Sequence, residues 1–253
     1  MKLWKIMSII CAAMVVSTIV ICLCCRLTVK DAGISDIRDI GGYLEYCSGV
    51  PIKAIDRKAV SMAEFILSNK DKYKTGVSSE GLYVHHDLQV FVVEKVDMTN
   101  ANDETIFQLP GEVAQDVKVV KVLQGDNIEG EYINLYGIGG ILIQYDNSIV
   151  NMGVNWKNVM LPGNQYLVFC ECVENMQELE NCCGYPLKYR LIYSLFNQLN
   201  ITRDMTQLLN EDGTCSDWSN IEFFTYNSDT LDALLEIKRE ILKEYGLKVG
   251  DSI

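Results

Sequence analysis

Histidine and positive charge are both scarce in this chain. Among 253 residues there are two histidines, and 22 Lys and Arg face 34 Asp and Glu, which gives a formal net charge of −12. Because phosphate binding needs clustered Lys and Arg, the acidic balance argues against a nucleic acid partner. The shortage of histidine removes most of the common catalytic and metal-binding signatures. What remains, 49% hydrophobic and 22% charged, is typical of a folded globular chain.

The residues that suggest chemistry do not combine into a site. His85 and His86 lie in a strand-like run, where neighbours point to opposite faces and cannot bind one metal together. The segment 137–140 lacks the last glycine of a phosphate loop, since Leu142 stands there, and 210–213 lacks the first carboxylate of a calcium loop. Asn200-Ile-Thr202 fits a glycosylation acceptor only as a chance tripeptide. We therefore expect no catalytic residue, no metal and no cofactor.

The N-terminus carries the clearest signal for location. Ile6 to Cys25 are 20 consecutive uncharged residues, enough for a helix of roughly 30 Å, the thickness of a bilayer core. Lys2 and Lys5 precede this run and Arg26 follows it. We expect residues 6–25 to be an uncleaved membrane anchor. A cleaved or lipidated signal, or a buried soluble helix, is the alternative, although no A-x-A-like cleavage site is present.

The charge distribution agrees with a solvated domain beyond this anchor. Residues 1–30 hold four basic residues and no acidic one, so residues 31–253 carry 18 basic against 34 acidic groups, a net charge of −16. Such a domain is repelled by an anionic lipid surface. The sequence predicts a single-pass protein of the cell membrane with most of its chain extracytoplasmic, or a secreted or lipid-anchored one if the N-terminal segment is cleaved.

Six cysteines lie outside the anchor, and an exported domain permits them to form up to three disulfides. Cys170 and Cys172 share one face of a predicted strand, where they are better placed to reach Cys182 or Cys183 than each other. Unpaired buried thiols and a metal site are the alternatives, although the spacing is not that of a zinc motif. The possible disulfide set is Cys47, Cys170, Cys172, Cys182, Cys183 and Cys215.

Short strands dominate the middle of the chain. Runs rich in β-branched and aromatic residues predict strands at 81–96, 117–123, 132–136, 138–145, 166–173 and 188–197. Strands at this spacing are typical of a small antiparallel barrel or sandwich. Tyr132, Tyr136, Tyr145, Trp156 and Tyr166 fall in this region, and we interpret these aromatic residues as core packing rather than as a binding platform.

Helices flank this region on both sides. Apolar residues recur at helical spacing over 55–69, and the pattern over 230–245 is stronger, with Gly246 placed to end that helix. The fold class is therefore mainly β with flanking helices (α+β). We expect an anchor or signal at 1–30, a juxtamembrane spacer at 31–54, and one extracytoplasmic barrel domain at 55–253.

About 60 residues carry a family resemblance. The pattern V-x-x-V-L-x-G-D, then G-x-x-I-x-L, then L-P-G-x-x-Y-L-V-F resembles exported bacterial proteins of unknown function with an OB-like barrel, related in shape to netrin and tissue-inhibitor-of-metalloproteinase modules. The resemblance implies an OB-like fold and says almost nothing about function. The matching residues are Val119, Val122, Leu123, Gly125, Asp126, Gly130, Ile133, Leu135, Leu161, Pro162, Gly163, Tyr166, Leu167, Val168 and Phe169.

The resulting expectation is a non-enzymatic binding or assembly module at the cell envelope. Its partners would be the membrane, through residues 6–25, and a protein or cell-wall ligand. Two alternatives stay open. One is an envelope enzyme that uses a thiol or an acidic site, and the other is a protease-inhibitor-like module with a ridge of loops near Cys47. The inhibitor mechanism itself does not transfer, because it requires a free N-terminal cysteine.

Overall fold

The computed structural model describes residues 44, 50–74, 88–96, 112–143, 149–173, 189–251 and 253. All of them belong to one compact unit, residues 38–253. The expected anchor at 6–25 and most of the expected spacer lie outside the described residues. Within the described ranges, no helix is both long and apolar enough to cross a membrane.

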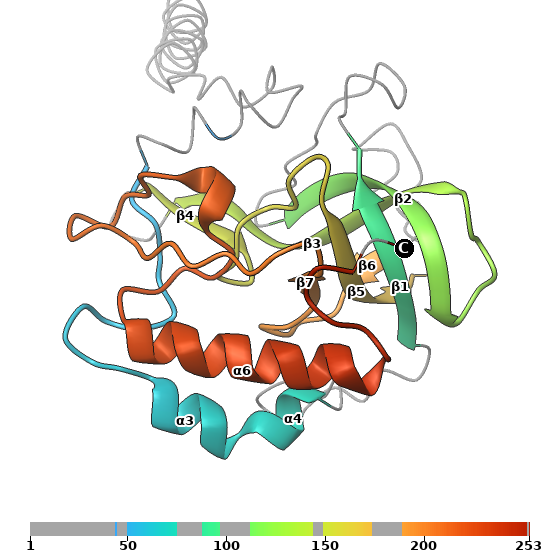
Figure 1. Ribbon diagram of the computed structural model, residues 1–253. Coiled ribbons are helices and arrows are strands. Elements are labelled where there is room, and N and C mark those ends of the chain that lie inside the picture. The colour runs from blue at the N-terminus through green and yellow to red at the C-terminus, as the bar shows by residue number, and fades with distance from the viewer. Residues whose placement is uncertain are drawn as a thin grey trace, which may run out of the picture. The chain divides into compact units, whose positions relative to one another are not determined.

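Five strands form a closed barrel (Figure 1). Each pairs with two others, in the order β1, β2, β3, β6, β5 and back to β1. The ring consists of β1 (Leu88–Lys95), β2 (Glu112–Gln124), β3 (Tyr132–Ile143), β5 (Gln165–Cys172) and β6 (Tyr189–Leu191). The prediction of a mainly β fold with a barrel is confirmed.

The sequence predicted an antiparallel barrel, but one pair of strands in this barrel is parallel. Strands β3 and β6 run parallel, with Leu135 beside Tyr189, whereas every other pair in the ring is antiparallel. The reason is geometric: strand directions cannot alternate around a ring with an odd number of strands. A closed five-stranded barrel therefore needs at least one parallel pair.

Strand β3 is longer than the sequence indicated, because two expected strands join into one. Its first half pairs with β2 and its second half with β4 (Ile149–Val154), so that each half has a different antiparallel partner. Gly137 lies between the two halves, where an added Cβ would come within 3.0 Å of Val154 and 3.1 Å of Leu191. An alanine here would require the Val154 and Leu191 side chains to shift by a few tenths of an ångström, so glycine suits this close approach.

A short strand and an N-terminal segment complete the sheet. Strand β7 (Gln198–Asn200) pairs with β5 beside β6. Residues 51–53 run next to β4: Asn151 N donates to Pro51 O at 2.9 Å, and Lys53 N donates to Asn151 O at 2.9 Å. The chain thus enters the domain alongside β4.

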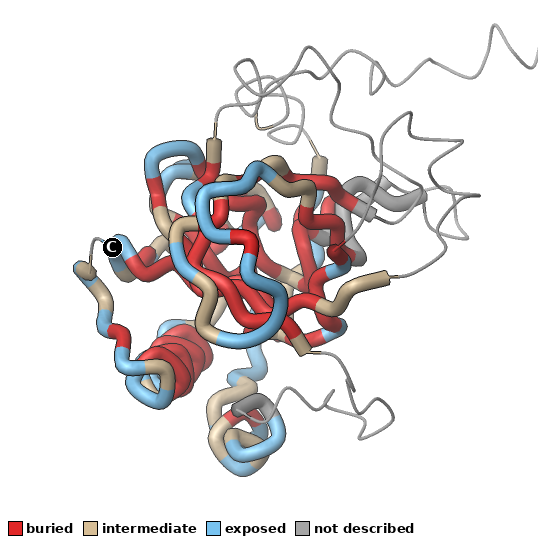
Figure 2. The backbone as a smooth tube through the Cα atoms, turned by 90° about the vertical axis from the view of Figure 1, so that its right-hand side faces the viewer, coloured by how far each residue is buried: buried red, intermediate tan, exposed pale blue. Residues whose placement is uncertain are grey.

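Helix α6 (Ser228–Glu244) covers one side of the barrel, and α3 (Ala63–Ser68) and α4 (Lys70–Lys74) lie beyond it (Figure 1). Buried residues dominate the barrel strands and continue along α6 (Figure 2). Alternation along β1 directs Val90 and Val92 toward the helix layer and Phe91 and Val93 to the opposite face. Phe91 meets Tyr189 edge to face, with ring centroids 5.6 Å apart.

The C-terminal helix matches its sequence pattern closely. It buries five of the six apolar positions of the predicted helical face, Leu231, Leu234, Leu235, Ile241 and Leu242, whereas the sixth, Tyr245, follows the last helical residue and is partly exposed. Gly246, at φ +69°, ends the helix in the left-handed conformation that glycine adopts most easily. The prediction of a C-terminal helix is therefore confirmed.

The helix expected over 55–69 is present only in part, since α3 begins at Ala63. Asp56 is buried and accepts hydrogen bonds from Thr225 Oγ1 at 2.5 Å, Tyr226 N at 2.9 Å and Asn227 Nδ2 at 3.1 Å. These long-range bonds hold residues 55–61 in a non-helical path. The helix propensity of this segment contributes less free energy than three hydrogen bonds to a buried carboxylate.

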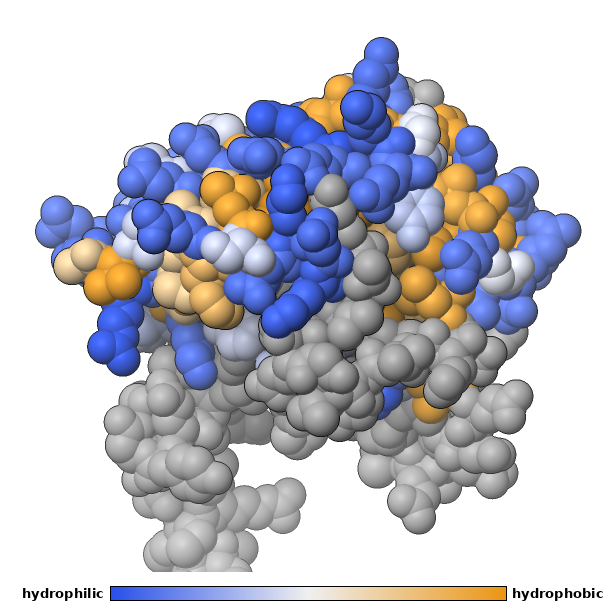
Figure 3. Space-filling model, turned by 90° about the horizontal axis from the view of Figure 1, so that it is seen from below, coloured by the Kyte–Doolittle hydropathy of each residue, from blue (hydrophilic) through white to orange (hydrophobic). Residues whose placement is uncertain are grey.

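On the helix side of the molecule, most of the visible surface of the described residues is hydrophilic. Figure 3, which views the molecule from below, shows apolar side chains in small groups among hydrophilic ones. Phe65 on α3 is 53% exposed, while its neighbour Ile66 is buried against α6. Scattered exposed apolar residues of this kind are normal on protein surfaces.

Candidate functional site

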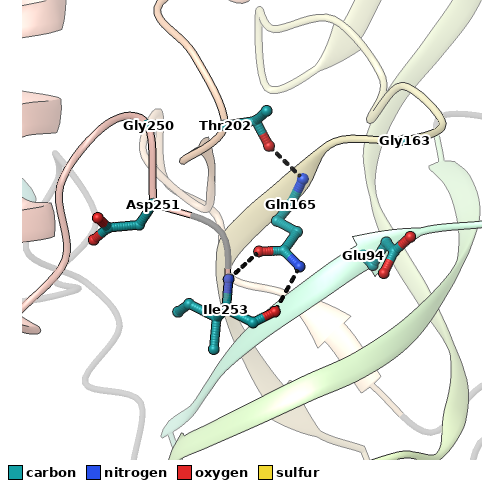
Figure 4. A pocket seen from close by; sticks show the side chains of 7 residues that line it. All are labelled: Glu94, Gly163, Gln165, Thr202, Gly250, Asp251 and Ile253. Carbon is teal, nitrogen blue, oxygen red and sulfur yellow. Dashed lines mark hydrogen bonds between the residues drawn. The ribbon is translucent and has the colours of Figure 1, made fainter.

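A hollow of about 410 Å³ lies where the start of β5 meets the end of β1 and the C-terminal segment (Figure 4). Its volume is in the range of small-molecule sites. Its lining is mostly polar, unlike that of a typical drug-sized pocket. The lining residues are Glu94, Gly163, Gln165, Thr202, Gly250, Asp251 and Ile253.

Several polar groups of the hollow are already used within the protein (Figure 4). The Gln165 side chain forms two hydrogen bonds with the Ile253 backbone, both 3.1 Å long, and the Gln165 N–H donates to Thr202 Oγ1 at 2.8 Å. Asp251 accepts from Lys248 N at 2.8 Å. The carboxylates of the lining could still contact a small polar ligand. The described residues contain no group of three or more acidic, Cys or His side chains able to hold a metal.

A charged cluster is buried between α6 and the barrel. Lys238 on α6 is fully buried and pairs with Glu222 at 2.7 Å and with Asp204 at 3.2 Å. Burial by itself would raise the pKa of Asp204, but the hydrogen bond from Arg239 and the charge of Lys238 outweigh it and lower that pKa. Glu222 also accepts from Asn200 N at 2.9 Å. These contacts attach the helix to β7, which is a structural role.

Lys157 is a second fully buried lysine in the same region. Its Nζ donates to Gln198 O and lies 5.6 Å from the centre of the Phe223 ring. Burial lowers its pKa to about 7, against a partial opposing effect from the charge of Glu222. A neutral amine at pH 7 is a potential nucleophile, but this amine has no exposed surface through which a substrate reaches it.

Two of the three described cysteines, Cys170 and Cys215, do not have the surroundings of reactive thiols. Cys170 lies on the face of β5 shared with Tyr166 and Val168, is fully buried, and has its pKa raised by that burial. Burial likewise raises the pKa of Cys215. Cys172, at the end of β5, is partly exposed. The predicted disulfides stay a prediction, because Cys47, Cys182 and Cys183 lie outside the described residues, as does any inhibitor-like ridge near Cys47.

The weaker motifs resolve into ordinary structure where they are described. The segment 137–140 belongs to β3, and 210–213 is a turn closed by the Asn210 N–H to Thr214 O bond of 2.8 Å. Asn200 is fully buried, so its tripeptide offers no glycosylation site in the folded protein. His85 and His86 lie outside the described residues.

Two aromatic residues that the sequence analysis assigned to the core are at least partly exposed. Tyr132 is 64% exposed at the start of β3, opposite Lys118 of β2. Trp156 is partly exposed and packs against Tyr193, with ring centroids 6.4 Å apart. Tyr136 and Tyr166 are buried as expected, and Tyr145 lies outside the described residues.

Trp156 has an unusual backbone. Asn155 and Trp156 have φ values of +52° and +61°, and the residues on either side form both hydrogen bonds of a two-residue hairpin, Val154 N to Lys157 O at 2.7 Å and Lys157 N to Val154 O at 3.3 Å. These φ signs are those of a type I′ turn, which prefers Asn followed by Gly. Tryptophan in the second position costs about 1–2 kcal/mol.

Sequence reasoning missed this turn and the buried lysines. Asn155 was the one local signal for the turn, because Asn tolerates positive φ, but the bulky residue after it hid the pattern. Nothing in the local sequence marks Lys157 or Lys238 as buried, since lysine is almost never buried without partners and these partners are distant in the chain. Comparison with protein-family models and with curated proteins gives no match for this chain.

Proposed function

We propose that this protein is a non-enzymatic binding or assembly module of the cell envelope. In this proposal, residues 6–25 anchor the chain in the membrane, and the barrel lies outside the cytoplasm. Support comes from the uncharged N-terminal run, the net charge of −16 beyond it, and an exposed tyrosine on the outer face of the barrel. The ligand is a protein or a cell-wall component, since the acidic surface disfavours nucleic acid.

The strand order favours an OB-like barrel. Numbered along the chain, the five barrel strands follow one another around the ring as 1-2-3-5-4, with strands 3 and 5 parallel. This order fits the five-stranded Greek-key barrel of OB-folds, which bind extended ligands on the outer face of strands 2 and 3. The corresponding strands are β2 and β3 here.

The observation that carries the proposal is the outer face of β2 and β3. Tyr132 is 64% exposed on it, next to Lys118, and Asn134 Nδ2 donates to Asp116 Oδ1 at 2.7 Å two residues further along. An exposed tyrosine beside a fixed polar pair combines apolar contact area with hydrogen-bonding groups. Such combinations are typical of binding surfaces.

Site-specific photo-crosslinking in intact cells tests this face. Tyr132 of the full-length protein is replaced by p-benzoylphenylalanine and irradiated, with the same replacement at Glu211, whose side chain is 97% exposed, as the matched control. We expect an adduct of higher mass from position 132 only. Digestion by protease or by a cell-wall hydrolase identifies the class of partner. Equal adducts at both positions, or none at 132, contradict the proposal.

The location has its own test. Glu211→Cys in the full-length chain provides an exposed thiol, because that side chain is 97% exposed, whereas native Cys170 is buried. A membrane-impermeant maleimide should label this variant in intact cells above the background of the unmodified protein. Labelling only after lysis would place the barrel in the cytoplasm and remove the envelope from the proposal.

A further inference from the structure

The Trp156 turn is fastened to the loop that carries Tyr193. Asn155 Nδ2 lies 3.4 Å from both Ile192 O and Ser194 O, the carbonyl oxygens on either side of Tyr193. The two rings are therefore positioned by a buried amide beneath them as well as by their own contact of 6.4 Å. The result is a fixed aromatic pair, with Tyr193 39% exposed.

The turn keeps tryptophan where glycine would be easier to accommodate. The backbone at position 156 is left-handed, with φ +61°, and glycine adopts this conformation without steric conflict. Strain of this kind persists where the side chain has a use that glycine cannot supply. The Trp156 ring contacts Tyr193 at the surface, where both rings are partly accessible to a ligand.

Two amide oxygens beneath the aromatic pair have no hydrogen-bond partner. Asn155 is 2% exposed and Asn197 is fully buried, and the Nδ2 atoms of both face Ile192 O, at 3.4 Å and 3.1 Å. This arrangement fixes the orientation of both amides. The Oδ1 atom of each has no hydrogen-bond partner in the structure. Neither oxygen has exposed surface, so each can accept a donor only from a water molecule that lies beneath the surface and bridges to a ligand hydroxyl.

The two segments that form this site carry almost no charge, although the chain as a whole is strongly acidic. Residues 149–156 and 191–202 contain no Asp, Glu, Lys or Arg. The adjacent Lys157 directs its amine inward to Gln198 O. A charged ligand thus finds no counter-charge in either segment, whereas a neutral ligand rich in hydroxyl groups matches aromatic rings and amide oxygens.

We propose that Trp156 and Tyr193, with Asn155 and Asn197 beneath them, form a binding site for a neutral oligosaccharide. The rings pack against the C–H faces of the sugar, and the buried amide oxygens interact with its hydroxyl groups through bridging water. This site is separate from the face that carries Tyr132. The start of β3 lies about 20 Å along the strand from Gly139, which pairs with Val154 beside the turn.

The test uses the purified full-length protein in detergent micelles. Hexasaccharides of β-1,4-linked glucose, N-acetylglucosamine, mannose and xylose are titrated in turn, and binding is followed by ligand-observed saturation-transfer NMR. We expect at least one of the four to bind. Trp156→Gly and Tyr193→Ala should each weaken that binding at least about tenfold.

Two controls separate binding from folding. Trp156→Gly should keep the melting temperature of the wild type or exceed it, because glycine suits this turn. Trp218→Phe changes another partly exposed tryptophan, which packs on Phe224, and should leave the affinity unchanged. Tyr132→Ala should also leave it unchanged, since it removes an exposed aromatic residue that lies outside this site.

Each of the following outcomes would contradict the proposed binding site. Absence of binding by all four glycans rejects the oligosaccharide, and full affinity in folded Trp156→Gly rejects the aromatic pair. Loss of binding in Tyr132→Ala but not in Tyr193→Ala moves the glycan to the β2–β3 face. That result would reject this inference and support the proposed function, so the two fail separately.

Discussion

Replacing Lys157 by methionine should change how the stability of this protein depends on pH. The lysine is fully buried, and its pKa of about 7 in the folded state lies well below the value of 10.5 expected for the unfolded chain. Between these two values the unfolded state binds more protons than the folded state, so the stability of the wild type rises with pH. Methionine has similar length and no proton to bind.

The size of the effect follows from the two pKa values. From pH 6 to pH 9 the unfolded lysine stays protonated, while the buried one loses its proton around pH 7. The difference, integrated over this range, is about two pH units, or about 2.7 kcal/mol at 1.36 kcal/mol per unit. The wild type should gain this amount relative to Lys157→Met. A constant offset of about 1 kcal/mol is expected from the lost hydrogen bond to Gln198 O.

Urea unfolding at pH 6 and pH 9, followed by tryptophan fluorescence, measures this difference directly. Lys121→Met is the matched control, because Lys121 is exposed on β2 and should show no such pH-dependent gap. If the stability difference between wild type and Lys157→Met is the same at both pH values, the amine is not desolvated in the folded protein. The reasoning about its burial would then be wrong.

Two substitutions and one labelling experiment also test the packing. Gly153→Ala should lower the free energy of unfolding by about 3 kcal/mol or more, since glycine there has φ +56° and an added Cβ would overlap the Lys157 carbonyl oxygen; an unchanged melting temperature would contradict this. Lys238→Met should cost about 3–5 kcal/mol in urea unfolding by leaving buried Glu222 without its cation, and adding Glu222→Gln should recover part of it. Cys170 should react with maleimide only after unfolding, and equal rates in native and denatured protein would show that it is accessible.

The sequence predicted elements whose stability is local or strongly patterned. Helix α6 has an apolar face that repeats every three to four residues and a glycine at its end, and the structure buries that face. Strands β2 and β5 were likewise evident, β2 from its β-branched residues and β5 from its run of apolar and aromatic residues. In these elements local propensity and tertiary packing favour the same conformation.

Elements that depend on distant partners were not predictable. Residues 55–62 have a helical pattern, but Asp56 is bonded to residues about 170 positions away. The joining of two expected strands into β3 accompanies pairing with distant segments, β2 over the first half and β4 over the second. The aromatic pair of Trp156 and Tyr193 likewise arises only when two loops meet.

The position of residues 51–53 beside β4 has a consequence for self-association. Strand β4 pairs with β3 on one side only, and an unpaired strand edge is a template for joining another chain. Here the parallel bridge of Ile52 with Asn151 occupies part of that edge. A chain that lacks residues 1–54 would expose this edge, and its first failure should be intermolecular strand pairing and aggregation, ahead of any loss of the barrel core.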